Sequence, residues 1–387
     1  MIEPLVRIGL CENETFGLYP HGAFSVNASD DVVTYMPHDD DAYMLIKGLQ
    51  IGRGFHWQQS RDMKFGGVVQ ISKHNGRTLL LNMIKAERYL QSVVGSEMHP
   101  DAPQEFVKSH AIISRSWLFR QLQIKNKKLF SQSAEYNSES NRLISWTESD
   151  EHKDFDVCPD DHCQRYQGLE AMTPSSKKAV DATRGLVLTD MGGEIADTRY
   201  SKCCGGITEL FSSCWGDIEI PYLVSVVDPY CSPNRLKAAM KKNPFLLKEY
   251  DASTIDYYDW KVEVSASLIE DNLIKLYDTD IGRIEDLQPL KYGPSGRIVE
   301  LKVVGSRDSV IIGKELSIRK LLSETHLYSS AFKINKMAGG FMLHGKGWGH
   351  GVGLCQIGAA VMAVEGYTCE QILAHYFPGT TLSQLYS

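Results

Sequence analysis

The stretch that decides the fold of this chain is GKGWGHGVGLCQIGAA, residues 345–360. Six glycines fall within fourteen residues there, although glycine is less stable than alanine inside a regular element by roughly 0.5–1 kcal/mol. Such a run predicts positive φ angles or the close approach of another group to the backbone. The small residues from Ala359 to Ala363 then predict a helix. We therefore expect a glycine loop that leads into a helix and holds Trp348, His350 and Gln356 over an open surface.

Two side chains of this loop suit the binding of a sugar. Trp348 could stack on a sugar ring, and His350 could hydrogen-bond to it. The simpler interpretation of His350 is a histidine whose nitrogens are satisfied within a tight turn. We favour the binding role because the glycine frame also holds Gln356.

Composition and charge narrow the function classes. The chain has 387 residues, of which 43% are hydrophobic and 23% charged, as is usual for soluble globular proteins. Its net charge of −7 argues against non-specific nucleic-acid binding, and no nucleic-acid-binding motif is visible. No apolar run approaches the roughly 20 residues of a membrane span. No signal segment is visible either, so we expect a cytoplasmic protein or a trimmed mature form.

The element pattern predicts an α+β protein, with strand-rich domains and a few helices around a central substrate groove. Strand patterns dominate the first 80 residues, where His74-Asn75-Gly76 between two β-rich runs predicts a hairpin. We expect four parts: a strand-rich element at 1–66, a central region at 67–230 with an insertion at about 132–170, a mixed accessory region at 231–338, and a C-terminal loop and helix at 339–387 that complete the groove.

Two helices are expected to flank a short loop that carries an acid. The apolar face from Tyr89 to Val94 predicts a helix that ends at Gly95, and Pro103 opens a second helix that runs to about Leu122. Glu97 lies between them. A partly shielded carboxylate there suits a general acid, which must carry its proton near neutral pH. On position alone, an exposed glutamate near a helix start is the preferred explanation.

Arg115 lies at the edge of the apolar stripe of the second helix. Arginine is rarely buried without a partner, so we expect it to reach a carboxylate or backbone carbonyl groups. It is a candidate for bracing the Glu97 loop and contacting substrate, although a structural ion pair is the simpler role.

Four donors in twelve residues match the ligand set of a tetrahedral zinc site: His152, Cys158, His162 and Cys163. The surrounding segment is polar and would gain stability from a metal cross-link. A full ligand set leaves no open position, which indicates a structural site. The alternative is a local disulfide with bystander histidines, and we favour zinc.

A glycine pair marks another candidate binding loop. Residues 200–208 read YSKCCGGIT and follow a predicted strand. Gly205 and Gly206 allow a sharp turn, and the hydroxyl groups of Ser201 and Thr208 on either side could contact a ligand.

The chain has nine cysteines, and several of them cluster. Cys203 and Cys204 are adjacent and could act as nucleophile, metal ligand or disulfide partner. Cys214 or Cys231 could pair with one of them. A nucleophile is disfavoured because no histidine at helical or strand spacing would activate either thiol.

Four motifs in order resemble the SpoIID/LytB family, the sporulation stage II protein D group of bacterial cell-wall enzymes. The resemblance runs from about residue 67 to 380. Ser96-Glu97-Met98 resembles the start of its SEMP motif, and Gly205–Thr208 resembles its GGxT loop. Gly349–Ala359 resembles its GHGVGMSQYGA segment, and Tyr376–Thr380 resembles its closing YYPGT.

The resemblance implies a peptidoglycan lytic transglycosylase that cleaves the MurNAc–GlcNAc bond of glycan strands and leaves 1,6-anhydro-MurNAc ends. Glu97 would be its catalytic acid and base. Some members hold zinc through His and Cys residues, which implies a structural Zn²⁺ at the cluster of residues 152–163. Other relatives are non-catalytic glycan-binding enhancers of a cell-wall amidase. The family also implies a location in the cell envelope or periplasm. We expect the substrate groove to form where the Glu97 loop, the GGxT loop and the GHGVG loop meet. The candidate substrate-binding residues are Arg115, Ser201, Gly205, Gly206, Thr208, Trp348, His350 and Gln356.

The residues of the motifs fit this reaction independently of the resemblance. Most glycosidases need two carboxylates, whereas a lytic transglycosylase can use one. The C6 hydroxyl of the muramic acid attacks its own C1, and this internal attack supplies the proximity that a second carboxylate would otherwise arrange. Glu97, with no obvious partner carboxylate in the motifs, suits that scheme. A zinc amidase or peptidase is a third hypothesis, and the closed four-ligand set argues against it.

Overall fold

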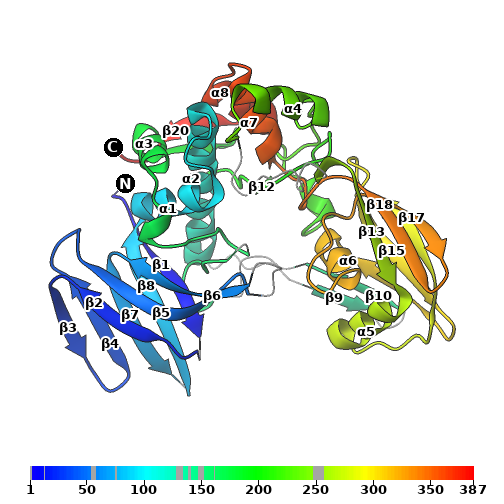
Figure 1. Ribbon diagram of the computed structural model, residues 1–387, viewed down its shortest axis with the longest axis horizontal. Coiled ribbons are helices and arrows are strands. Elements are labelled where there is room, and N and C mark those ends of the chain that lie inside the picture. The colour runs from blue at the N-terminus through cyan, green and yellow to red at the C-terminus, as the bar shows by residue number, and fades with distance from the viewer. Residues whose placement is uncertain are drawn as a thin grey trace. The chain divides into compact units, whose positions relative to one another are not determined.

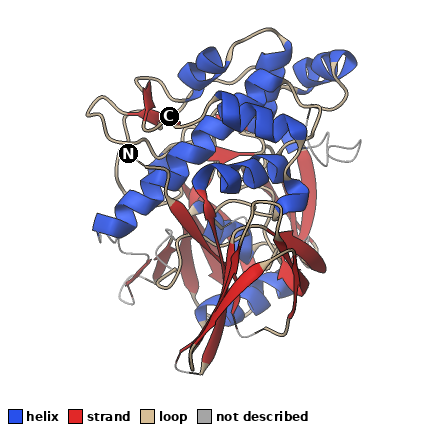
Figure 2. Ribbon diagram, turned by 90° about the vertical axis from the view of Figure 1, so that its left-hand side faces the viewer, coloured by secondary structure: helices blue, strands red, loops and turns tan. Residues whose placement is uncertain are grey.

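The computed structural model describes residues 2–12, 14–53, 58–74, 76–127, 134–137, 141–146, 152–160, 162–246 and 257–387. Strands β1 to β8 precede helix α1, later helices and strands are interspersed, and the strands form several separate sheets, so the predicted α+β fold is confirmed (Figure 1, Figure 2). Within these residues, no helix has the length and apolar character needed to span a membrane.

The chain forms two compact units, and the second is inserted into the sequence of the first. Unit 1 comprises Met1–Phe130, Ser149–Asp197 and Thr381–Ser387, and unit 2 comprises Ser131–Glu148 and Thr198–Thr380. The predicted division into four parts stays a prediction. The units cut across it, because sequence patterns mark single elements and not which elements pack together.

Unit 1 contains two antiparallel sheets and a two-stranded pair. The strand orders are β1-β8-β7-β4-β3, β2-β5-β6 and β11-β20. The strands are β1 (Leu5–Glu12), β2 (Gly17–His21), β3 (Phe24–Ala28), β4 (Val32–Pro37), β5 (Tyr43–Ile51), β6 (Gln59–Phe65), β7 (Val68–His74), β8 (Arg77–Lys85), β11 (Leu186–Thr189) and β20 (Thr381–Gln384). The predicted hairpin is present as the antiparallel pair β7–β8, although Asn75 lies outside the described residues.

The helices of unit 1 pack against one another beside these sheets. They are α1 (Ala86–Glu97), α2 (Gln104–Lys127) and α3 (Pro174–Ala182), together with the 3₁₀ turn η3 (Leu169–Ala171). Helix α2 is the long helix of this unit, labelled in Figure 1. Strand β8 leads directly into α1.

The prediction that Gly95 ends the first helix is wrong. Helix α1 continues to Glu97, and the N–H of Met98 donates to the carbonyl of Val94 at 2.9 Å. Gly95 is required by packing instead, because a Cβ atom there would lie 1.9 Å from the carbonyl oxygen of Ala171. The glycine allows η3 to contact the α1 backbone directly.

Unit 2 contains a five-stranded sheet of order β14-β15-β16-β10-β9, a three-stranded sheet of order β13-β18-β17, and the short parallel pair β12-β19. Its strands are β9 (Ala134–Asn137), β10 (Arg142–Ser145), β12 (Tyr200–Ser201), β13 (Trp260–Ser265), β14 (Ile284–Tyr292), β15 (Ile298–Gly305), β16 (Ser309–Gly313), β17 (Phe332–Met337), β18 (Gly340–Gly345) and β19 (Leu354–Cys355). Its helices are η4 (Phe211–Ser213), α4 (Pro233–Lys242), α5 (Ala266–Tyr277), α6 (Glu315–Leu321), α7 (Gln356–Val364) and α8 (Cys369–Tyr376).

Residues 231–338, expected to form a mixed accessory region, include α4 and α6 as well as several strands. Helix α4 ends at Lys242, and residues 247–250 lie outside the described part of the chain.

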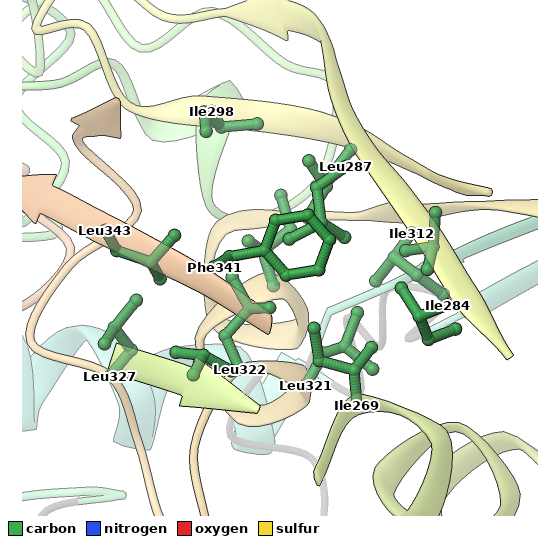
Figure 3. Packing of buried hydrophobic residues seen from close by; sticks show 14 of the residues in the cluster. Ile269, Ile284, Leu287, Ile298, Ile312, Leu321, Leu322, Leu327, Phe341 and Leu343 are labelled. Carbon is green, nitrogen blue, oxygen red and sulfur yellow. The ribbon is translucent and has the colours of Figure 1, made fainter. Parts of the chain in front are cut away.

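A hydrophobic core joins the two larger sheets of unit 2 (Figure 3). Phe341 and Leu343 of β18 are at most 1% exposed and pack with Leu287, Ile298 and Ile312 of the five-stranded sheet. Burial of apolar surface stabilises the folded state by roughly 25 cal/mol per Å² of surface removed from water. This core therefore gives the loops of unit 2 a rigid base.

Replacement of Gly95 by alanine is expected to lower the free energy of unfolding by about 1–3 kcal/mol, since the new methyl group overlaps the Ala171 carbonyl. Chemical denaturation measures this change. Gly192→Ala is the matched control, because an added Cβ there meets only the Asp190 side chain, at 3.3 Å. Equal stability of the two variants would contradict the packing role of Gly95.

Candidate functional site

Glu97 is the last residue of α1 and is partly exposed. The predicted loop at this position is wrong by two residues, because the helix runs through Ser96 and Glu97 before Met98 ends it. Met98 is 2% exposed, so the chain is anchored directly after the acid. Glu97 also lies at the C-terminal end of the helix, where the dipole does not stabilise a carboxylate as it would at a helix start.

Arg115 pairs with Glu87 and not with Glu97. Its Nε and Nη2 donate to the two carboxylate oxygens of Glu87 at 2.8 and 2.7 Å, and Nη1 donates to the carbonyl of Leu186 at 3.1 Å. Both side chains are buried, and the hydroxyl of Tyr386 donates to the same carboxylate. The guanidinium group is thus fully used inside unit 1, which is the simpler structural role considered above. We leave Arg115 out of the proposed binding set.

The predicted metal cluster comes together in unit 1. The ligand atoms of His152, Cys158, His162 and Cys163 all lie within 4.8 Å of one another. The Cys163 sulfur is 3.3 Å from Nε2 of His152 and 3.5 Å from Nδ1 of His162. Sulfur and nitrogen ligands of a tetrahedral zinc ion lie about 3.6 Å apart. The cluster could therefore hold a metal ion, as predicted.

Both cysteines of the cluster are free thiols, so the disulfide alternative is not what the structure shows. Hydrogen bonding from Cys163, followed by that from His152 and His162, lowers the pKa of Cys158 against the effect of burial. A thiolate is the form of cysteine that binds metals. The cluster thus stabilises one thiolate before any ion binds.

The segment that follows the cluster packs against the helix that carries Glu97. The Ser92 hydroxyl of α1 donates to the carbonyl of Gly168 at 2.7 Å, and the Ala171 carbonyl lies against Gly95. On the other side, the N–H of Gly9 donates to the carbonyl of Val157 at 3.0 Å. The segment around the cluster therefore contacts both α1 and β1 of unit 1.

The two glycine loops meet in unit 2. Cys203 and Trp348 exchange two backbone hydrogen bonds of 3.1 and 2.8 Å, and the N–H of Glu209 donates to the carbonyl of Gly351 at 2.9 Å. Strands β12 and β19 continue the contact as a parallel pair. The predicted association of the GGIT loop, residues 205–208, with the GHGVG loop, residues 349–353, is thus present within this unit. Their predicted meeting with Glu97 involves both units and stays a prediction.

Arg297 connects the two loops through hydrogen bonds, and this role was not predicted from the sequence. Its guanidinium group is buried and donates to the carbonyl of Cys204 at 3.1 Å and to the carbonyl of Gly349 at 3.0 Å. A Cβ atom at Gly351 would lie 2.5 Å from the Arg297 Cζ atom. The loop is glycine-rich partly because an arginine lies against its backbone. No motif marks Arg297, since it lies about 50 residues before the loop that it holds.

The positive charge of Arg297 is balanced inside the same network. Its Nη1 donates to the hydroxyl of Ser295 at 2.9 Å, and the N–H of Ser295 donates to Glu209 at 3.2 Å. Glu209 is buried and also accepts from the N–H of Leu210 and the hydroxyl of Ser213. Paired burial of this kind avoids the large cost of an isolated buried charge.

The remaining glycines behave as the sequence predicts. Gly347, Gly349, Gly351 and Gly353 all have φ between 70° and 88°, as has Gly205 at 79°. The loop then enters α7, whose N-cap is Cys355. A glycine loop that leads into a small-residue helix is thus confirmed.

Several predicted binding residues have structural contacts. Thr208 is 1% exposed and receives a 2.7 Å hydrogen bond from the N–H of Val226. Gln356 is buried at the first residue of α7. Ser201 is 7% exposed, and its hydroxyl has no hydrogen-bond partner within the described residues. Gly206 is partly exposed and therefore remains open to a ligand.

His350 is the satisfied histidine of the simpler interpretation. Its Nδ1 accepts from the N–H of Val352 at 3.0 Å, and its ring meets Trp215 edge-on at 5.0 Å. Burial, followed by the charges of Arg199 and Arg297, holds the pKa of His350 well below its usual range. A neutral ring that supports the turn is the consequence.

Trp348 belongs to an aromatic group on unit 2. Its ring stacks on Tyr328 with centroids 4.5 Å apart, and Tyr257 meets it edge-on at 4.3 Å. All three side chains are partly exposed. Rings that are fixed in this way and remain accessible suit stacking against the apolar face of a sugar.

The region that contains Glu97 and the metal cluster matches the model of a known family, described as stage II sporulation protein (SpoIID), over residues 74–189. This chain is a relative of the SpoIID proteins. The predicted resemblance is therefore confirmed. A second model, described as a domain of unknown function (DUF8618), matches residues 209–353, which include much of unit 2.

Similar proteins agree with this assignment. An uncharacterized protein of Brachyspira hyodysenteriae is 28% identical over 324 residues, which cover 83% of this chain and 72% of that protein. Stage II sporulation protein D of Bacillus subtilis is 26% identical over 305 residues, with 78% and 75% coverage. The amidase enhancer of B. subtilis is 26% identical over 247 residues, which cover 58% of this chain and only 35% of that protein.

Arg297→Lys is expected to lower the free energy of unfolding by about 3 kcal/mol, because one ammonium group cannot reach both carbonyls and charge-assisted hydrogen bonds contribute roughly 1.5–3 kcal/mol each. Urea unfolding followed by intrinsic fluorescence measures the loss. Arg235→Lys is the control, since Arg235 forms a half-exposed ion pair with Glu365 and should change stability by less than about 1 kcal/mol. Similar losses in both variants would count against the role of Arg297.

Proposed function

We propose that this SpoIID relative is a peptidoglycan lytic transglycosylase and that Glu97 is its acid and base. The observation that carries the proposal is the placement of the glutamate of the Ser-Glu-Met motif at the accessible end of α1, inside the region that matches the SpoIID model. The buried Met98 and the close contact at Gly95 hold this end of the helix in place. A general acid needs a fixed position that the substrate can reach.

The reaction needs one proton that is lent and then recovered. Glu97 donates it to the glycosidic oxygen between MurNAc and GlcNAc, and the bond from that oxygen to C1 of the muramic acid breaks. The C6 hydroxyl of the same sugar then attacks C1 while the Glu97 carboxylate accepts its proton. No water is consumed, so the product is a 1,6-anhydro sugar and Glu97 returns to its protonated form.

Unit 2 is proposed to bind the glycan strand. The aromatic group of Tyr257, Tyr328 and Trp348 offers ring faces for stacking, and Gly206 of the GGIT loop is also partly exposed. The buried Ser201, Thr208 and Gln356 and the partly exposed His350 would act by shaping these loops. Peptidoglycan as substrate implies a location in the cell envelope.

The cluster of unit 1 is proposed to hold a structural zinc ion. His152, Cys158, His162 and Cys163 supply the two sulfur and two nitrogen ligands that Zn²⁺ prefers, at separations that fit a tetrahedral ion. A bound ion would fix the segment that supports α1 from Gly168 to Ala171.

A second candidate function is the stimulation of a cell-wall amidase by a chain that binds glycan without cutting it. The relative named amidase enhancer favours it. On this alternative, glycan binding would depend on unit 2 and would survive the loss of Glu97.

Glu97→Gln is expected to reduce the release of anhydro-muropeptides by about 10²–10⁴-fold, because an amide cannot donate the proton and general acid–base catalysis contributes this much. Mass spectrometry of digested peptidoglycan detects the products, which are lighter by one water than hydrolytic products. Glu105→Gln is the matched control, as Glu105 lies on the same unit and pairs with Lys108 at the surface. Unchanged turnover in Glu97→Gln would remove the proposal, and retained strand binding without any product from the wild type would favour the enhancer.

Cys163→Ser is expected to lose about one equivalent of zinc and to unfold more readily, because the ion would stabilise the segment that packs against α1. Its activity should fall in proportion to the loss of folded protein. Metal analysis, thermal denaturation and the peptidoglycan assay are measured on the same sample. Cys11→Ser, at a buried cysteine of unit 1 outside the cluster, should keep its metal. If chelation abolished activity while leaving stability unchanged, the metal would be catalytic and this assignment would be wrong.

A further inference from the structure

Unit 2 holds a second group of metal-ligating side chains, distinct from the cluster of unit 1. Cys204, Asp228, Cys231 and Cys355 are all buried, and their ligand atoms lie within 4.8 Å of one another. They come from separate segments of the chain: the residue before the GGIT loop, the turn before α4, and the N-cap of α7. Nothing in the proposed glycan chemistry uses them.

Their separations fit a bound ion. The sulfurs of Cys204 and Cys231 are 3.5 Å apart, and the Cys204 sulfur is 3.2 Å from Oδ2 of Asp228. On a tetrahedral zinc ion, two sulfurs lie about 3.8 Å apart, and a sulfur and an oxygen lie about 3.5 Å apart. A disulfide would need sulfurs about 2.05 Å apart, and all four cysteines of this region, including Cys203, are free.

The surroundings orient these atoms as the outer shell of a metal site does. The Tyr376 hydroxyl donates to Oδ2 of Asp228 at 3.0 Å, and the N–H of Tyr230 donates to Oδ1 at 3.0 Å. The Cys355 sulfur accepts from the N–H groups of Cys204 and Gly358 at 3.3 and 3.4 Å. Outer hydrogen bonds of this kind fix ligand orientation and favour the thiolate.

Simple packing does not explain the group. Three thiols alone could pack as small apolar side chains, but a carboxylate in the same place is costly to bury without a positive partner. Within the described residues, the partners of the Asp228 carboxylate are a thiol, a hydroxyl and two backbone N–H groups, and none is a Lys, Arg or His side chain. The nearby Arg297 donates to the Cys204 carbonyl instead. A cation between the four ligands would supply the missing charge.

The geometry points to a second structural metal centre in unit 2, in which Cys204, Cys231, Cys355 and Asp228 bind Zn²⁺ or another thiophilic divalent cation. Binding releases to solvent the protons of whichever ligands are protonated beforehand. The ion fastens the start of the GGIT loop to the N-terminus of α7 and to the turn before α4. This proposal does not rest on the cleavage reaction proposed above. Its test is distinct as well, because metal content is measured without substrate.

The test counts metal in the full chain, purified under reducing, oxygen-free conditions with zinc present. Elemental analysis should give about two equivalents in the wild type and one each in Cys163→Ser and Cys355→Ser, the two sites being separate. The double variant should hold none. Cys214→Ser, at a buried cysteine of the same unit outside the group, should keep both.

Two further measurements protect the test against misfolding. Cobalt added to Cys163→Ser should produce thiolate-to-cobalt charge-transfer absorption, which requires no variant in unit 2. Asp228→Asn preserves side-chain shape and should weaken metal binding about tenfold or more, with circular dichroism confirming the fold.

Absence of metal and of charge-transfer absorption in Cys163→Ser would overturn the second centre. A disulfide between Cys204 and Cys231, found by mass spectrometry without reduction, would also overturn it. Unchanged affinity in Asp228→Asn would remove the carboxylate from the set and overturn the four-ligand site.

Discussion

The buried guanidinium group of Arg297 is the constraint on which unit 2 depends. It binds the carbonyls of Cys204 and Gly349, one from each glycine loop, and the absence of a side chain at Gly351 makes room for it. Three otherwise separate facts follow from this contact: the glycine content of the second loop, the strand pairing of Cys203 with Trp348, and the buried Glu209 that balances the charge through Ser295. The glycine loop, whose sequence suggests a ligand-binding loop, thus accommodates the side chain of Arg297.

Much of this architecture was predictable, because it rests on local rules. The β7–β8 hairpin, the positive φ angles of the glycine loop and the metal-ligand spacing of residues 152–163 each depend on a few neighbouring residues. The family resemblance added the pairing of the two glycine loops, which no local pattern contains. Fold class followed from the alternation of strand and helix signals, but the division into two units did not, since β20 returns to β11 across nearly 200 residues.

What could not be predicted depended on distant partners. Gly95 resembles a helix terminator, yet it is inside α1 because the Ala171 carbonyl lies against it from 76 positions further along the chain. Arg115 was expected to reach an acid, but the sequence could not choose Glu87 over Glu97. His350 was given a binding role because of its glycine frame, whereas both its hydrogen bond to Val352 and its contact with Trp215 are internal. In each case the residue type indicated a special role, but the sequence did not identify the residue that it contacts.

The Arg115–Glu87 pair also connects the separate segments of the chain that make up unit 1. Glu87 lies in the first turn of α1, Arg115 lies in α2, and the Tyr386 hydroxyl reaches the same carboxylate from the last residues of the chain. Gly185 donates to it as well, just before β11 pairs with β20. A buried pair is costly to leave incomplete, by roughly 3–5 kcal/mol when a partner is removed. The helix that carries Glu97 is therefore fully supported only after the chain has passed through unit 2 and returned. Glu97 thus depends on the complete chain even though its own motif is three residues long.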